Sequence, residues 1–127
     1  PDIYGHETLG DIEAQCRQLA AGHGMELDWF QSNLEGELIE KIQQAVGKVD
    51  WIIINAAGLT HTSVVLRDAL SLFPGEVIEV HLSNVHSRES FRHISLISAI
   101  AKGVIAGFGA SSYYMAINAI PNLHSET

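Results

Sequence analysis

Several residue types that mark large classes of protein are scarce in this chain. It has a single cysteine, Cys16, so it forms no internal disulfide, and a thiol in an apolar helical stripe is expected to be buried and structural. Seven Lys and Arg stand against fifteen Asp and Glu, for a formal net charge of -8. Such a chain lacks the broad basic surface that general nucleic-acid binding needs. No apolar run is long enough to cross a membrane. We therefore expect a cytoplasmic protein that binds neither nucleic acid nor membrane.

Two kinds of ligand site are also missing from the pattern. No G-x-G-x-x-G or Walker-type loop follows a strand-like run, which argues against nucleotide binding. Gly107 and Gly109 lack the rest of such a motif, although a helix beginning there suits an anion. His81, His86 and His93 do not have the spacing of a compact metal-ligand set, and no cysteine lies near them. Neither a metal nor another cofactor is expected.

The residues that are present favour one α/β domain over positions 1–127. Strand-like runs alternate with amphipathic helical patterns, which is typical of βαβ units and a parallel sheet. Strands are predicted over 25–31, 50–55, 76–82 and 103–108, and helices over 8–23, 34–46, 63–73, 94–101 and 111–120. Thr8 with Asp11 forms a capping-box pattern at the first helix, and Pro121 is expected to end the last one.

Cations and histidines gather in one part of this acidic chain. Between positions 61 and 93 lie three of the four arginines and four of the seven histidines: Arg67, Arg88, Arg92, His61, His81, His86 and His93. Parallel sheets bind ligands beyond the carboxyl ends of their strands, so polar residues in and beside the loops that follow the strands are expected to meet in one crevice. We predict a site there for a small anion, with proton-transfer groups beside it.

The strongest candidate pair lies on one predicted strand. Glu79 and His81 are two residues apart, so both side chains point to the same face. Glu79 is placed to hold the imidazole in one tautomer, as in catalytic pairs. The alternative is a strand-end histidine bonded to backbone, and the spacing does not choose between them. Ser83 and Asn84 begin the next loop, where a hydroxyl and backbone N–H groups suit a carboxylate, but the same residues also favour ordinary turns.

Other candidates have similar alternatives. Arg92 lies one helical turn after another arginine and among aromatic and histidine neighbours, so it suits a carboxylate better than a surface salt bridge. Asn55 ends a buried strand and suits either a ligand hydroxyl or a loop-starting Asx turn. Thr62 or Ser63 is expected to cap a helix, and that role leaves His61 unexplained.

Five segments carry a recognisable pattern: PDIYG at 1–5, FQSNLEGELIEKI at 30–42, IIINAAGLTHTSVVLRDAL at 52–70, IEVHLSNVHSRESFRH at 78–93 and AKGVIAGFGASSY at 101–113. In this order they closely resemble the type II 3-dehydroquinate dehydratases, the small dehydroquinases of the shikimate pathway. The resemblance implies a flavodoxin-like three-layer sandwich with a parallel sheet in the order 2-1-3-4-5. It also implies dehydration of 3-dehydroquinate to 3-dehydroshikimate through an enolate, without cofactor, by a homo-dodecamer arranged as a tetramer of trimers.

The resemblance also implies roles for nine residues. Tyr4 matches the catalytic base, His81 the general acid, Glu79 its orienting partner, and Asn55 a residue that holds a substrate hydroxyl and supports the histidine. The substrate-binding positions are Leu82 and Ser83 for the carboxylate, His61 and Arg92 for hydroxyls, and Asp68, which reaches the active site of a neighbouring subunit.

Some features depart from the family pattern. The family begins with a strand and a loop of the type NGPNLNLLGxRxP, which carry an activating arginine, and this chain has no match to them. We expect the polypeptide to extend upstream of Pro1, because a missing central strand would leave unpaired backbone, and we expect a molecule that began there to be inactive. Smaller departures lie at Ala56-Ala57, Ile94 and Ser112, where the family often has Pro-Gly or Pro-Ala, His and Gly. None of them is expected to touch a residue with a role.

A second function stays open at this point. A flavodoxin-like module that binds a small anion or signals without catalysis would bind ligand at Ser83 and Arg92 without turnover. A flavin protein is a weaker alternative. The sequence does not decide between a biosynthetic role and a part in quinate catabolism.

Overall fold

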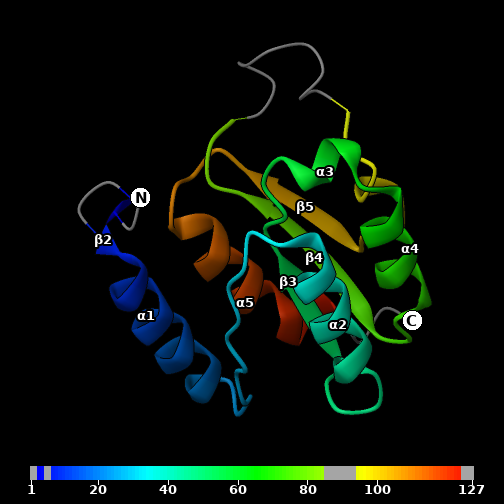
Figure 1. The fold of residues 1–127 in the computed structure, drawn as a ribbon. Coiled ribbons are helices and arrows are strands. Elements are labelled where there is room, and N and C mark those ends of the chain that lie inside the picture. Colours follow the sequence, from blue (N-terminus) through cyan, green and yellow to red (C-terminus); the bar gives the residue numbers. More distant parts are fainter. Residues whose placement is uncertain (1–2, 5–6, 85–93, 124–127) are drawn as a thin grey trace.

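The computed structural model describes residues 3–4, 7–84 and 94–123, the first two by their backbone alone (Figure 1). A sheet of three strands lies between two layers of helices. The predicted α/β class with a parallel sheet is therefore confirmed. Among the described helices, none combines the length and the apolar character needed to cross a bilayer.

The sheet consists of β3 (Trp51–Ile54), β4 (Glu76–His81) and β5 (Gly103–Ala106), in the order β3-β4-β5 with every pairing parallel. β-branched residues dominate β3 and β4, and such side chains pack well on a surface covered on both faces. Because the strands are parallel, their carboxyl ends meet at one edge. Three of the four predicted strands are thus confirmed, while the full order 2-1-3-4-5 stays a prediction.

One face of the sheet is covered by α2 (Glu35–Ala45) and α4 (Val64–Leu72), which pack on Ile54 and Val77. Leu66 of α4 is completely buried there, and removing a leucine side chain from water stabilises the fold by about 1.5–3 kcal/mol. The short helix α3 (Leu59–Thr62), which the sequence did not predict, leads into α4 at the carboxyl end of β3.

The other face is covered by α1 (Leu9–Gly22) and α5 (Ser111–Leu123). Cys16 of α1 is buried and free, which confirms its structural reading. Burial, together with the nearby Glu7 and Glu13 carboxylates, raises the pKa of the Cys16 thiol to about 11. The thiol is therefore protonated and unreactive near neutral pH.

The predicted capping box begins α1. The Thr8 hydroxyl accepts from the Asp11 N–H at 3.1 Å, and the Asp11 carboxylate accepts from the Thr8 N–H at 3.1 Å. At the other end His23 is the C-cap, and Gly24 follows with φ of 74°, a left-handed conformation that glycine adopts without strain. Both boundaries agree with the sequence prediction.

A small antiparallel ribbon precedes α1, in a part of the chain for which the sequence predicted neither strand nor helix. It consists of β1 (Ile3–Tyr4) and β2 (Glu7–Thr8), with Tyr4 paired to Glu7. The Tyr114 hydroxyl donates to the Glu7 carboxylate at 2.7 Å. Burial raises the pKa of Tyr114, and the hydrogen bond and charge of Glu7 raise it further. Since Tyr114 lies in the first turns of α5, this bond holds the ribbon near the carboxyl edge of the sheet.

The predicted strand over 25–31 is wrong as a strand. Its side chains do alternate, with Met25, Leu27 and Trp29 half-buried against the cluster of α1 and α5. Within the described part of the chain, however, no strand pairs with this segment. Alternation of side chains predicts an extended backbone, whereas a strand also needs a neighbour to complete its hydrogen bonds.

Two predicted helices also differ from the structure. Over 94–101 the described chain is helical only in a single 3-10 turn, η3 (Ser98–Ile100), because the Ser95 hydroxyl accepts from the N–H groups of Ile97 and Ser98 and forms a turn instead. At the end of the chain α5 continues past Pro121 to Leu123. A proline so close to a helix end disturbs only the last turn, so the helix tolerates it.

Candidate active site

The carboxyl edge of the sheet holds a buried pair. Glu79 and His81 of β4 are 1% and 6% exposed, and the Nε2 of His81 is hydrogen-bonded to the Glu79 carboxylate. The other carboxylate oxygen of Glu79 accepts from the Ser98 hydroxyl at 2.7 Å. With Nε2–H directed at Glu79, Nδ1 is the ring nitrogen left for proton exchange with a substrate. The sequence left open whether the His81 ring is held by Glu79 or by a backbone group, and in the structure it is held by Glu79.

The surroundings of this pair also shift the pKa of the Glu79 carboxyl group. Burial alone raises the pKa of Glu79, but hydrogen bonds from His81, Ser98 and Ser95, together with the charge of His81, lower it by more, so the net shift is downward. The carboxylate therefore stays ionised at neutral pH. An ionised Glu79 can both orient the imidazole and stabilise an imidazolium.

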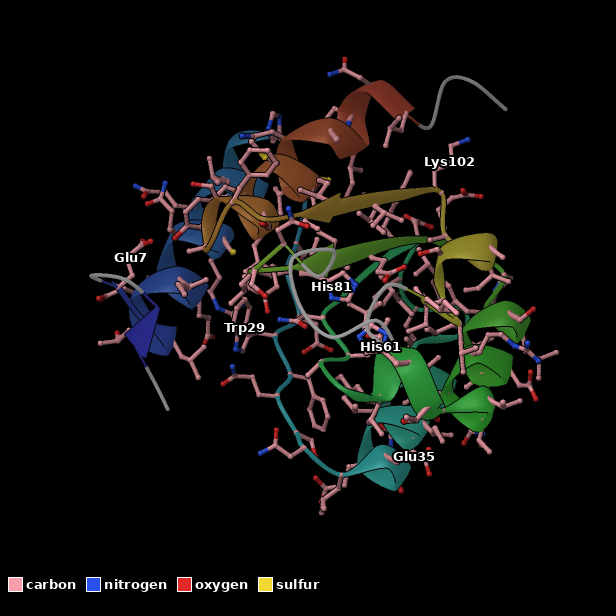
Figure 2. The ribbon with its side chains drawn as sticks, turned by 90° about the horizontal axis from the view of Figure 1, so that it is seen from above. Glu7, Trp29, Glu35, His61, His81 and Lys102 are labelled. Atoms are coloured by element: carbon pink, nitrogen blue, oxygen red, sulfur yellow. The ribbon has the colours of Figure 1, made fainter. Side chains whose placement is uncertain are left out.

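His61 lies beside His81, as Figure 2 shows. The rings of His61 and His81 are stacked, with centroids 6.4 Å apart and planes 15° apart. Nδ1 of His61 donates to the carbonyl oxygen of Ile94 at 2.7 Å, because a carbonyl can only accept. This bond fixes the ring orientation of His61. The unpredicted turn α3 is what brings the residue to the edge of the sheet.

Asn55 follows β3 directly, and its neighbour Ile54 pairs with Glu79 across the sheet. Its side-chain oxygen accepts from the Ala57 N–H at 3.2 Å, so the Asx turn left open by the sequence is present. Its amide nitrogen donates to the Tyr113 hydroxyl at 3.2 Å. Both bonds hold the Asn55 amide in one orientation at the carboxyl edge.

Leu82 and Ser83 follow β4, Leu82 half-buried and Ser83 exposed. The carbonyl of Leu82 accepts from the N–H of Gly109 at 2.8 Å, which joins this segment to the loop after β5. Gly107 and Gly109 of that loop have φ of 94° and 57°, conformations that favour glycine. Leu82 and Ser83 therefore lie at the same edge as Glu79 and His81.

Three predicted site residues are not brought to this cluster by the described structure. Asp68 lies on the exposed face of α4 and pairs with Arg67 at 2.9 Å. Tyr4 has its backbone in β1, but its side chain lies outside what the structure describes. Arg92 also lies outside the described residues.

Three contacting residues were missed by the sequence reasoning. Ser98 donates to Glu79, Tyr113 accepts from Asn55, and the Ser112 hydroxyl donates to the His81 carbonyl at 3.1 Å. The expectation that the departures at Ala57, Ile94 and Ser112 touch no residue with a role was wrong. Each of these contacts involves a backbone N–H or carbonyl group, which side-chain spacing does not reveal.

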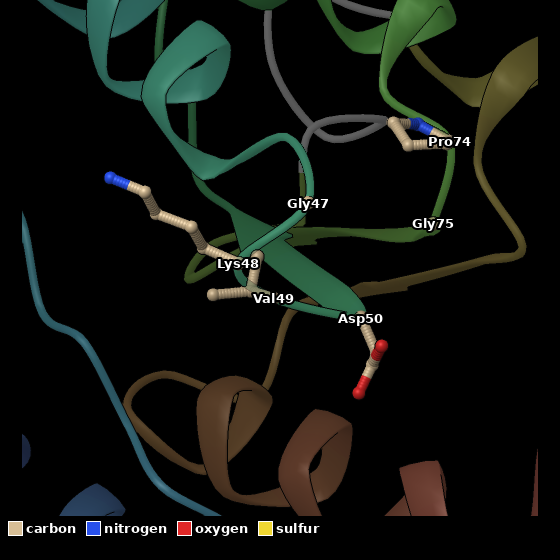
Figure 3. Close-up of a pocket in the computed structure, with 6 residues that line it drawn as sticks. All are labelled: Gly47, Lys48, Val49, Asp50, Pro74 and Gly75. Carbon is tan, nitrogen blue, oxygen red and sulfur yellow. The ribbon is translucent and has the colours of Figure 1, made fainter.

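A hollow of about 300 Å³ lies at the opposite, amino edge of the sheet (Figure 3). It is lined by Gly47, Lys48, Val49, Asp50, Pro74 and Gly75, the residues that lead into β3 and β4. Ligands of open parallel sheets bind at the carboxyl edge, so this hollow is not the candidate site. The described residues also contain no group of three side chains suited to hold a metal ion.

Comparison with known proteins agrees with this arrangement. A family model described as dehydroquinase class II matches residues 1–121. A 3-dehydroquinate dehydratase of Synechococcus sp. (strain WH7803) is 52% identical over 122 residues, which cover 96% of this chain and 83% of that protein. Catabolic 3-dehydroquinase 1 of Fusarium vanettenii is 52% identical over 124 residues, covering 97% and 86%. A crystal structure of a type II dehydroquinase from Butyrivibrio crossotus superposes with a TM-score of 0.88 at 40% identity, over 94% of this chain and 83% of that one. From the match in sequence and in flavodoxin-like fold, we conclude that this chain belongs to the class II dehydroquinase family.

Proposed function

We propose that this class II dehydroquinase is a lyase that dehydrates 3-dehydroquinate to 3-dehydroshikimate by anti elimination through an enolate. The observation that carries the proposal is the buried Glu79–His81 pair at the carboxyl edge of the sheet. Relatives named as dehydratases favour an enzyme over a small-anion binding module without catalysis. They include a catabolic enzyme, so the reaction serves either the shikimate pathway or quinate catabolism.

The elimination needs a base and an acid. Loss of a proton next to the ketone gives the enolate, and the hydroxyl then leaves as water once it is protonated. In our proposal His81 donates that proton from Nδ1, while Glu79 at Nε2 stabilises the imidazolium. A positioned general acid typically contributes about 10²- to 10⁴-fold. Tyr4 is the proposed base, and its phenol, with an ordinary pKa of about 10, requires a nearby cation to act near neutrality.

The remaining residues are proposed to bind the substrate. Asn55 and His61, both held by hydrogen bonds to the fold, are proposed to contact hydroxyls, and the same role is proposed for Arg92, which lies outside the described residues. Leu82, through its backbone N–H, and Ser83 are proposed to bind the carboxylate. A carboxylate suits exposed N–H groups at the end of a strand.

We propose a homo-dodecamer in which Asp68 reaches a neighbouring site. Asp68 lies on α4 in line with Val64, Val65 and Leu72, which are 48%, 58% and 82% exposed. An apolar stripe of this kind on a helix is typical of a contact with another copy. Exchanging Leu72 for Asp should lower the molar mass measured by light scattering, and an unchanged dodecamer would remove α4 from the interface. A cytoplasmic location completes the proposal, since the reduced Cys16 thiol suits a reducing compartment.

The product is a conjugated enone, so turnover is measured as a rise in ultraviolet absorbance on mixing protein with 3-dehydroquinate. His81→Ala should lower kcat at least about 100-fold because it removes the proposed acid. His23→Ala is the matched control. His23 lies at the end of α1, away from the site, where its Nε2 is hydrogen-bonded to Asn118 of α5. The turnover rate of this variant should equal that of the wild type. Normal turnover in His81→Ala would remove His81 from its role, and no absorbance change with the full-length wild-type protein would reject the function itself.

A further inference from the structure

Ser112 joins two segments of the candidate site through one buried hydroxyl. The side chain is completely buried in the first turn of α5. Its hydroxyl donates to the carbonyl oxygen of His81 at 3.1 Å and accepts from the N–H of Phe108 at 3.3 Å. It therefore connects the end of β4 with the loop after β5.

The His81 carbonyl has a second donor in the N–H of Gly107, at 3.2 Å. Since His81 pairs with Ala106 of β5, this carbonyl points toward β5. A trans peptide is planar, and its C=O and N–H point in opposite directions. The N–H of Leu82, at the other end of the same peptide, therefore points toward the carboxyl end of β3, where Asn55 lies.

From this geometry we propose that Ser112 is a positioning residue that aims the Leu82 N–H at the substrate carboxylate by holding the His81 carbonyl. The assignment rests on the proposed role of Leu82 in binding that carboxylate. Two donors on one carbonyl polarise the peptide and make its N–H a better donor. Ser112 thus acts through the backbone without touching the substrate.

The test compares Ser112→Ala with Ser111→Ala, an exposed serine in the same helical turn. Loss of one hydrogen bond to the peptide should raise KM for 3-dehydroquinate about fivefold, with a much smaller change in kcat. Ser111→Ala should match the wild type. Ser112→Thr keeps the hydroxyl and should restore much of the affinity. Thermal melting of each variant checks that it is folded.

Competitive inhibitors separate positioning from a general loss of structure. Quinate carries the carboxylate, and its uncharged primary amide does not. Ser112→Ala should weaken inhibition by quinate about fivefold and leave inhibition by the amide nearly unchanged. Equal losses for both inhibitors, or a KM equal to that of the wild type, would overturn the assignment to Ser112. Absence of turnover in the full-length wild-type protein would instead contradict the proposed function, so the two failures are distinguishable.

Discussion

The two edges of the central sheet use their polar residues differently. At the carboxyl edge Glu79 and His81 are buried and joined by hydrogen bonds to each other and to Ser98 and Ser112. At the amino edge there is a hollow, but it is lined by the two turns that lead into β3 and β4, in which glycine and proline are frequent and Lys48 and Asp50 are the charged residues. The comparison shows that buried and oriented polar side chains indicate a catalytic site better than a hollow does by itself.

The largest expected effect tests this difference directly. Glu79→Gln removes the ionised partner of His81, so the imidazolium that donates the proton loses its stabilisation, and kcat should fall about 100-fold. Asp50→Asn makes the same exchange of an acid for its amide at the amino edge, beside the hollow, and kcat should not change. Absorbance of the enone product measures both. A large loss of turnover in Asp50→Asn would show that the amino edge takes part in the reaction.

A smaller effect should appear at the amino edge as stability alone. A Cβ at Gly75 would lie 2.2 Å from the carbonyl oxygen of Asp50 and 2.7 Å from the ring of Phe73. Gly75→Ala should therefore lower the free energy of unfolding by about 1–3 kcal/mol through overpacking. Urea unfolding measures this loss. Gly36→Ala is the control, since a Cβ there meets nothing within 4 Å. A reduced kcat of the folded Gly75→Ala protein would contradict the prediction that the amino edge affects stability alone.

The smallest effect concerns the pH dependence of stability. Since the pKa of Glu79 is lowered in the folded state, the unfolded state takes up the proton first, and stability falls as pH drops below the ordinary carboxyl value of about 4.3. Ser98→Ala removes one donor, so the pKa of Glu79 is lowered less and the loss of stability between pH 7 and pH 4 becomes smaller. Urea unfolding at both pH values measures the difference. Ser71 is exposed on α4, so Ser71→Ala should lose as much stability between the two pH values as the wild type. If Ser98→Ala also lost as much as the wild type, Ser98 would not be a cause of the lowered pKa of Glu79.

Much of the fold was predictable from the sequence because local patterns carry it. The β-branched runs at 51–54 and 76–81 and the capping box at Thr8 each specify a local structure without a distant partner. Parallel pairing followed from the alternation of strands and helices, and with it the edge where Asn55, His61, Glu79 and His81 gather. The segment over 25–31 shows the limit, since its side chains alternate in burial but no described strand pairs with it, and the predicted strand was wrong.

Which residues could act follows from the sequence alone: the spacing of Glu79 and His81 on a strand and the family pattern around them are properties of the chain. How these residues are held follows from the packing of the folded chain. Ser98 and Ser112 contact this pair from 19 and 31 residues away in sequence, and His61 is oriented by a backbone carbonyl 33 residues away. Such contacts depend on where separate segments meet after packing. The sequence does not show which hydrogen-bond partner a given hydroxyl or carbonyl group will have in the folded protein.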